Sequence, residues 1–217
     1  MADKRLTPEL LLTAYASGIF PMAEARDDPE VYWVDPRVRG VLPLDRFHVS
    51  RSLTRDLKRD TYQVRMNSDL SAVLDGCADR SETWINGTIR TLVQALSERG
   101  FAHTMEVWSD DRLIGGVYGI ALGGAFFGES MFSREPNASK IALAWLVDHL
   151  RRAGFKLFDT QFITPHLVSL GAEEISREAY RAQLADALEI PTRIDSIPLE
   201  ADRHALVQRM TQTSYRA

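Results

Sequence analysis

The spacing of apolar residues predicts helices at both ends of the chain and strands in the middle. Apolar residues recur every three or four positions in six segments, which is the spacing of an amphipathic helix. Several of these segments begin at a Ser, Thr, Asn or Asp and end at a glycine, as helices commonly do. The predicted helices cover residues 8–17, 50–59, 69–77, 86–98, 137–152 and 176–188, with a short helix near 205–210.

Between residues 102 and 132 the apolar period changes to two, which is typical of strands. Two short turns, Ser109-Asp110-Asp111 and Gly123-Gly124, divide this region into three antiparallel strands. Strands are predicted at residues 32–34, 61–66, 102–108, 113–122, 125–132 and 156–162. A meander, then a helix, then a strand that pairs in parallel describes an α/β (α+β) mixed sheet flanked by helices, the order of N-acetyltransferase-like folds.

The length of 217 residues fits one main domain with a small addition. We expect residues 1–40 to form a small N-terminal α/β appendage, because this segment is too short to bury a core of its own. Residues 41–195 then form the domain that contains the sheet, and residues 196–217 form a C-terminal tail.

Charge and cysteine content exclude several classes of protein. The 26 basic and 30 acidic side chains give a net charge of −4, which excludes a wholly basic nucleic-acid binder but leaves room for a local basic patch. One cysteine, Cys77, permits no intramolecular disulfide, and the five histidines lack metal-ligand spacing. The N-terminus lacks a signal peptide, and six glycines interrupt the uncharged stretch 113–128. We therefore expect a cytoplasmic protein without a membrane span or a metal.

Three polar residues interrupt the apolar strands of the predicted sheet. Strand alternation places Asp159 and Gln161 on one face, where they lie either at an edge in water or at the bottom of a cleft. In a cleft, the carboxylate can accept a proton and the amide can donate to an oxyanion. Glu129 shares a face with Phe127 and Met131, and serves either a structural hydrogen bond or the recognition of a cation. Glu129 and Asp159 on adjacent strands predict an acidic spot in an apolar cleft.

Four basic residues in segment 50–59 recur at helical spacing. They form one stripe, which is either a solvated face or a site for a phosphate backbone. The stripe consists of Arg51, Arg55, Lys58 and Arg59. Before the helix at 137–152, the loop Ser133–Lys140 contains a proline and an acid but no glycine, which argues against an acetyl-CoA pyrophosphate site.

Several distinctive motifs occur in order over residues 8 to 180, beginning with Gly18-Ile19-Phe20-Pro21. The strongest are Phe127-Gly128-Glu129-Ser130-Met131-Phe132-Ser133-Arg134, Asn137-Ala138-Ser139-Lys140, and Asp159 with Gln161 and Ser169-Leu170-Gly171-Ala172. These motifs resemble those of leucyl/phenylalanyl-tRNA–protein transferases, bacterial enzymes of the N-degron pathway. One departure is Met22, which stands where the family often has Trp.

The resemblance implies transfer of Leu or Phe, and also Met, from aminoacyl-tRNA to proteins that begin with Arg or Lys, which marks them for degradation. No cofactor is implied, and we expect a monomer. The family's Asp and Gln activate the acceptor amine and fall on Asp159 and Gln161, with Glu129 beside them. The aminoacyl pocket would be lined by Val117, Phe127, Leu143 and Leu150. The tRNA site would comprise Arg51, Arg55, Lys58, Arg59, Trp84 and Tyr15.

Two other functions remain open at this stage. The first is an N-acetyltransferase that uses acyl-CoA, which is the commoner activity on this fold but conflicts with the loop Ser133–Lys140. The second is a non-catalytic RNA-binding module, which keeps the basic stripe but leaves Asp159, Gln161 and Glu129 unexplained.

Overall fold

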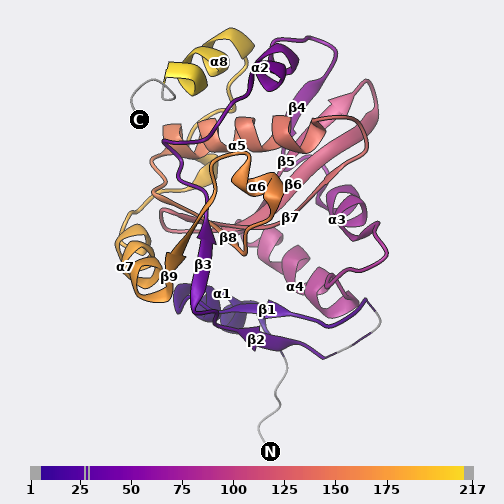
Figure 1. Cartoon of the computed structure of the whole chain (residues 1–217). Helices are drawn as coiled ribbons and strands as arrows, with labels where there is room; N and C mark the ends of the chain where they lie inside the picture. The colour runs from indigo at the N-terminus through magenta and orange to yellow at the C-terminus, as the bar shows by residue number, and fades with distance from the viewer. Residues whose placement is uncertain (1–5, 27, 29, 213–217) are drawn as a thin grey trace, which may run out of the picture.

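A seven-stranded mixed sheet forms the centre of the computed structural model, which describes residues 6–26, 28 and 30–212 (Figure 1). The strand order is β4-β5-β6-β7-β8-β3-β9, and all neighbours are antiparallel except β7 and β8, which are parallel. The strands are β3 (Val38–Val41), β4 (Gln63–Met66), β5 (Ala102–Ser109), β6 (Arg112–Leu122), β7 (Ala125–Ser133), β8 (Leu157–Gln161) and β9 (Glu173–Ser176). The predicted mixed sheet and its parallel strand pair are thus confirmed.

Helices cover both faces of the sheet (Figure 1). One face carries α5 (Ala138–Ala153), with α2 (Arg51–Leu57) and α8 (Arg203–Gln212) packed against it. The other face carries α1 (Pro8–Ala16), α3 (Leu70–Ala78), α4 (Gly87–Glu98) and α7 (Arg177–Leu188). Two apolar clusters result, one on each side of the sheet.

The helix α5 approaches the sheet closely because β6 contains glycine at the contact. A Cβ atom on Gly115 would lie 2.5 Å from the Cβ of Ala138, so no larger residue fits without a shift of the helix. The helix ends at Gly154, whose φ of 88° is the left-handed conformation common at helix C-termini. This close packing fixes α5 over the middle of the sheet.

Residues 20–34 add a two-stranded sheet of β1 (Phe20–Met22) and β2 (Tyr32–Val34) beside α1. Residue 40, where we expect the N-terminal appendage to end, falls within β3, which pairs with β8 and β9. In the C-terminal segment, α8 buries Leu206, Val207 and Met210 in the apolar cluster to which α5 contributes. Residues 1–5 and 213–217 lie outside the described residues.

Every helix and strand predicted from the sequence is present, with its ends shifted by at most a few residues. The strands β1, β3 and β9, the four-residue helix α6 (Pro165–Val168) and the 3-10 turn η1 (Ile194–Ser196) were not predicted. In the part of the chain that the structure describes, none of the helices combines the length and apolar character needed to cross a bilayer. Nor do three His, Cys, Asp or Glu side chains there gather in a way that suits a metal ion.

Candidate functional site

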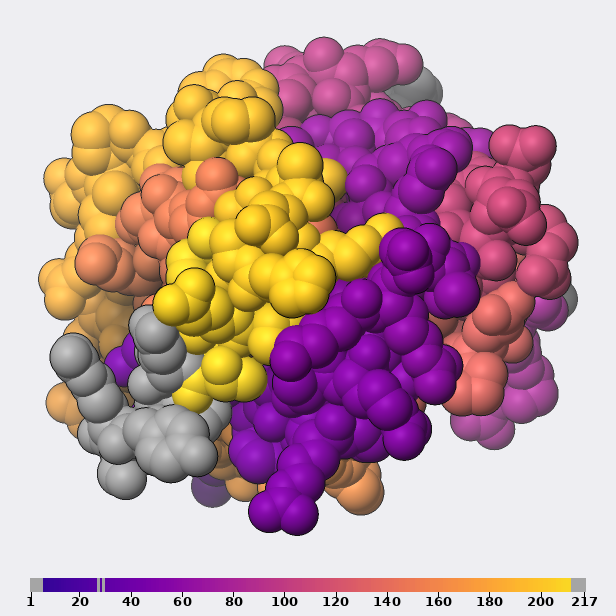
Figure 2. All heavy atoms as spheres, turned by 90° about the horizontal axis from the view of Figure 1, so that it is seen from above, coloured from indigo at the N-terminus to yellow at the C-terminus, as the bar shows by residue number. Residues whose placement is uncertain are grey.

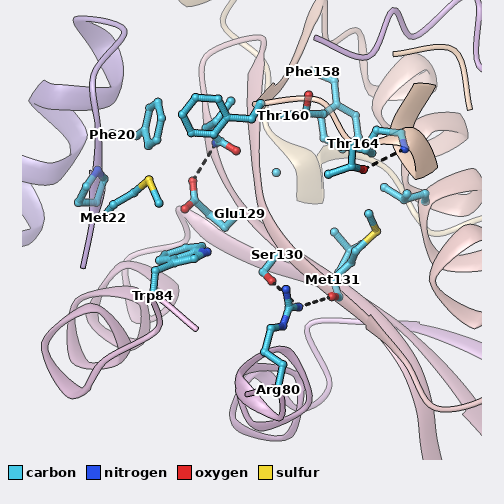
Figure 3. A pocket seen from close by; sticks show the side chains of 17 residues that line it. Phe20, Met22, Arg80, Trp84, Glu129, Ser130, Met131, Phe158, Thr160 and Thr164 are labelled. Carbon is cyan, nitrogen blue, oxygen red and sulfur yellow. Dashed lines mark hydrogen bonds between the residues drawn. The ribbon is translucent and has the colours of Figure 1, made fainter. Parts of the chain in front are cut away.

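A cavity of about 270 Å³ opens between the sheet and the appendage (Figure 3). Strands β7 and β8 form one wall, β1 forms another, and α5 and α6 close the apolar end. Its apolar lining comprises Phe20, Met22, Trp84, Val117, Met131, Leu143, Phe158, Phe162 and Leu167. Its polar lining includes Arg80, Glu129, Ser130, Thr160, Gln161 and Thr164.

Glu129 reaches this cavity because β7 contains a bulge. Tyr118 pairs with Ser130 and Gly119 pairs with Gly128, so Glu129 is an extra residue without a partner on β6. The bulge reverses the side-chain alternation, so that Phe127 lies in the cluster below the sheet while Met131 packs on the cluster above it. The prediction that Glu129 shares a face with both residues is therefore wrong.

The Glu129 carboxyl group accepts two hydrogen bonds from neighbouring elements. Its Oε1 accepts from the Tyr15 hydroxyl at 2.8 Å and from Gln161 Nε2 at 3.3 Å. Burial raises the pKa of Glu129 to about 8, against the opposing effect of the Tyr15 hydrogen bond. Glu129 therefore binds a proton more readily than an ordinary glutamate does near neutral pH.

Gln161 reaches the cavity through a break in the strand conformation. Its φ is 57°, in the left-handed region, so strand alternation ends there. Its backbone N–H donates to Asp159 Oδ1 at 2.8 Å, and its side chain lines the cavity, which Asp159 does not. The prediction that Asp159 and Gln161 present their side chains on one face is wrong for this reason.

Asp159 is fully enclosed and paired with a cation. Arg39 Nε donates to Oδ1 at 2.9 Å, and another nitrogen of the same guanidinium donates to Oδ2 at 2.6 Å. The Tyr180 hydroxyl donates to Oδ2 at 2.7 Å. Asp159 is 0% exposed and Arg39 is 1% exposed. Asp159 still contributes to the raised pKa of Glu129, but it is paired with Arg39 and does not line the cavity, so only Glu129 of the predicted acidic spot lies there.

Arg39 is the functional candidate that sequence reasoning missed. Its guanidinium lies 4.5 Å from the ring centroids of both Phe20 and Tyr180, and it donates to the Gly18 carbonyl at 3.0 Å. It therefore links the turn before β1 to Asp159 and, through Asp159, to Gln161. The sequence around it gives no local signal, since one arginine in a four-residue strand looks like a surface residue.

The structure brings only part of the predicted aminoacyl pocket together. Val117 and Leu143 line the cavity, but Phe127 and Leu150 do not. The Phe127 ring packs against Tyr15 at 4.8 Å on the opposite side of the sheet, because it precedes the bulge. Leu150 lies two turns beyond Leu143 on α5 and is fully buried in the core.

The predicted tRNA residues fall into three environments. Trp84 lines the cavity. Tyr15 is 2% exposed, so its ring cannot stack on RNA, and the prediction of a tRNA contact there is wrong. The stripe Arg51, Arg55, Lys58 and Arg59 is exposed on α2 and lies outside the cavity, beside α8 on the face shown in Figure 2.

Comparisons with known proteins point to one family. The family model "Leucyl/phenylalanyl-tRNA protein transferase" matches residues 41–185, and the model of that family's N-terminal domain matches residues 4–37. A leucyl/phenylalanyl-tRNA–protein transferase from Ruegeria sp. is 62% identical over 96% of this chain and 99% of its own length. One from Roseobacter denitrificans is 57% identical over 97% of this chain and 100% of its own.

A solved structure of FemX has a TM-score of 0.51 at 12% identity and covers 77% of this chain and 66% of its own. At this identity the likeness concerns the fold alone, and the N-acetyltransferase-like fold class predicted from the sequence is confirmed.

Proposed function

The chain belongs to the leucyl/phenylalanyl-tRNA protein transferase family, and we propose that it transfers Leu or Phe from aminoacyl-tRNA to the N-terminal Arg or Lys of a protein. Met is a third donor, and the product is marked for degradation. The observation that carries this function is the apolar cavity with the Glu129–Gln161 pair on its wall.

The apolar end of the cavity suits the aminoacyl side chain. Val117, Leu143, Phe158 and Leu167 surround a space without a charged group on that side. Burying a Leu or Phe side chain there contributes about 1.5–3 kcal/mol. A cavity of this kind discriminates weakly among unbranched apolar side chains, at about 1–3 kcal/mol per methylene, which explains why Leu, Phe and Met are all accepted.

The reaction requires alignment and one proton transfer. The acceptor α-amine attacks the ester carbonyl carbon, the new C–N bond forms, and the bond to the ribose oxygen breaks. One amine proton is lost, and the leaving ribose oxygen gains one. The ester already carries an activated acyl group, so positioning and stabilisation of the oxyanion supply most of the acceleration.

Glu129 and Gln161 are the groups placed to handle the amine. The pKa of Glu129, about 8, matches an N-terminal ammonium group, whose pKa is about 8, so a proton passes between them at little cost. The Gln161 amide donates to Glu129 and holds it in orientation. In its ionised form, the half-buried Glu129 carboxylate also attracts a cationic acceptor residue.

Asp159 takes a positioning role in this proposal. The resemblance assigned it to activation of the amine, but its enclosure by Arg39 and Tyr180 keeps it out of reach of substrate. Its Oδ1 fixes the backbone N–H of Gln161 instead. Asp159 therefore acts on the amine through Gln161.

RNA binding is assigned to two separate places. Trp84, at the cavity, stacks on the terminal adenosine, with Met22 also lining the cavity there (Figure 3). The exposed stripe Arg51, Arg55, Lys58 and Arg59 contacts the phosphate backbone. We propose that the protein acts as a monomer in the cytoplasm, which gel filtration and cell fractionation test.

The direct test mixes the protein with radiolabelled Leu-tRNA and a peptide that begins with Arg. A control peptide has the same sequence but begins with Ala. Label is expected in the Arg peptide and not in the Ala peptide. Equal labelling of both peptides, or none, contradicts the proposed acceptor. Tight acetyl-CoA binding in a calorimetric titration would support the acyl-CoA alternative instead.

A further inference from the structure

We propose that Arg80 and Arg134 form a binding site for phosphates of the single-stranded 3′ end of tRNA, in a hollow that adjoins the cavity beside α3. This inference rests on the proposed function, because it extends the donor site along the RNA. The site is separate from the stripe on α2 and from Trp84.

The cavity continues into a second hollow along the C-terminal half of β7. This hollow, of about 340 Å³, is lined by Arg80 and Met131, which also line the cavity, and by Gly76, Asp79, Phe132, Ser133 and Arg134. A chain that leaves the cavity beside Arg80 therefore enters a groove that ends at Arg134. A trinucleotide end of tRNA needs such a continuous groove.

Arg80 is held in place by β7 rather than by an acid. One guanidinium nitrogen donates to Ser130 Oγ at 3.2 Å and to the Met131 carbonyl at 2.9 Å, as Figure 3 shows. The side chain is exposed and forms no ion pair with the carboxylates of the described residues. Its charge is thus fixed at the mouth of the cavity and remains uncompensated.

Like Arg80, Arg134 at the other end of the groove is held by a backbone carbonyl rather than by an acid. It donates to the Leu113 carbonyl at 3.0 Å and lies 5.1 Å from the Phe132 ring centroid, again without an ion pair to any described carboxylate. Nearby arginines differ, since Arg112 pairs with Glu135 at 3.0 Å and Arg90 with Asp75 at 2.8 Å. Asp79 is the one acid that lines this hollow, so two cations face one anion.

The charge of the groove selects RNA over the acceptor. A protein that begins with Arg or Lys is cationic at its reacting end, and two uncompensated guanidinium groups repel it. Phosphodiester oxygens are the ligands that guanidinium groups bind best. The groove runs along α3, since Gly76 and Asp79 line it together with Arg80 and Arg134. The proposed RNA path therefore runs from the cavity past Arg80 to Arg134.

The test compares three donors that differ only in RNA length: leucyl-adenosine, the leucyl ester of the trinucleotide CCA, and Leu-tRNA. Leucyl-adenosine has no internal phosphate, whereas the trinucleotide has two. In Arg80→Gln and Arg134→Gln, we expect the ratio of kcat/KM for the trinucleotide to that for leucyl-adenosine to fall about ten- to a hundredfold. Arg112→Gln, which removes a neighbouring but paired arginine, leaves this ratio unchanged.

A double variant of α2 completes the design. Lys58→Gln/Arg59→Gln is expected to lower the ratio of Leu-tRNA to trinucleotide and not that of trinucleotide to leucyl-adenosine. Equal losses with leucyl-adenosine and trinucleotide would show that Arg80 and Arg134 only shape the cavity, which overturns the inference. The inference is also overturned if the ratio of kcat/KM for the trinucleotide to that for leucyl-adenosine is unchanged in both Arg80→Gln and Arg134→Gln. Failure of the wild-type protein to transfer from Leu-tRNA refutes the proposed function instead.

Discussion

Replacing Arg39 separates two roles of the buried network around Asp159. Arg39→Met keeps most of the side-chain volume but removes both hydrogen bonds to the carboxylate. Because both partners are buried, at 1% and 0% exposure, the Asp159 charge is left without a partner in a dry site. Breaking one side of such a pair costs about 3–5 kcal/mol of unfolding free energy. This is a large share of the total stability of a domain, which is about 5–15 kcal/mol.

Two double variants then distinguish stability from positioning. Arg39→Met/Asp159→Asn and Arg39→Met/Asp159→Leu both remove the unpaired charge, the first with a side chain of the same size as Asp and the second with a larger, apolar one. In the wild type, the Gln161 N–H donates to Asp159 Oδ1 at 2.8 Å. Only the Asn variant keeps an oxygen that can accept this hydrogen bond. We expect both to regain much of the stability lost in Arg39→Met, because a buried charge is no longer unpaired.

Their transfer activities are expected to differ. Without an acceptor at position 159, the Gln161 backbone loses the hydrogen bond that supports its φ of 57°, and its amide is expected to move relative to Glu129. A displacement of about 1 Å in a reacting group costs about a hundredfold in rate. The Leu double variant is therefore expected to lose about a hundredfold in kcat, whereas the Asn double variant stays within about tenfold of the wild type.

The assays are urea unfolding for stability, and steady-state transfer from Leu-tRNA to an Arg peptide for kcat and KM. The reasoning is refuted if the two double variants transfer at the same rate while their unfolding free energies are equal. The network around Asp159 would then serve the fold alone, and Gln161 would need no support from it.

Three further predictions concern other parts of the site. The pKa of Glu129, about 8, lies above its ordinary value of 4.5, so the folded protein binds more protons than the unfolded chain between these values and loses stability as pH rises through them. Glu129→Gln removes this loss of stability. As pH rises from 5 to 8, the urea midpoint of the variant should therefore increase relative to that of the wild type. Leu143→Ala enlarges the apolar end of the cavity, so the ratio of kcat/KM for Phe-tRNA to that for Leu-tRNA should rise several-fold, about 1 kcal/mol. In filter binding at several KCl concentrations, Lys58→Gln/Arg59→Gln should reduce the log–log salt slope by up to about one per lost phosphate contact, and an unchanged slope would remove α2 from the RNA site.

The long elements were predictable because their periods repeat several times. The helix α5 has sixteen residues with apolar side chains at helical spacing, and β5 to β7 alternate over eight to eleven residues with short turns between them. The four-residue strands β3 and β9 carry no such repetition. They form because β3 pairs with β8 and β9, more than a hundred residues away in the chain. Arg39 was missed for this reason, since only the position of β3 makes it a buried residue.

The polar pair of the site depends on two departures from regular strands. Glu129 stands in the bulge of β7, where its carboxyl group accepts from Tyr15, whose ring packs on Phe127. The left-handed backbone of Gln161 ends the strand alternation, and its amide meets Glu129 at 3.3 Å.

One of these departures left a trace in the sequence. A glycine inside a strand often marks a bulge or a close approach, and Gly128 directly precedes Glu129. A Cβ atom on Gly128 would lie 2.5 Å from the Phe158 ring on β8, so the strand passes there only without a side chain. Gln161 has no comparable signal, because its conformation is held by Asp159, and Asp159 is held by Arg39. The geometry of the proposed site thus depends on a contact between segments about 120 residues apart, which local sequence patterns do not encode.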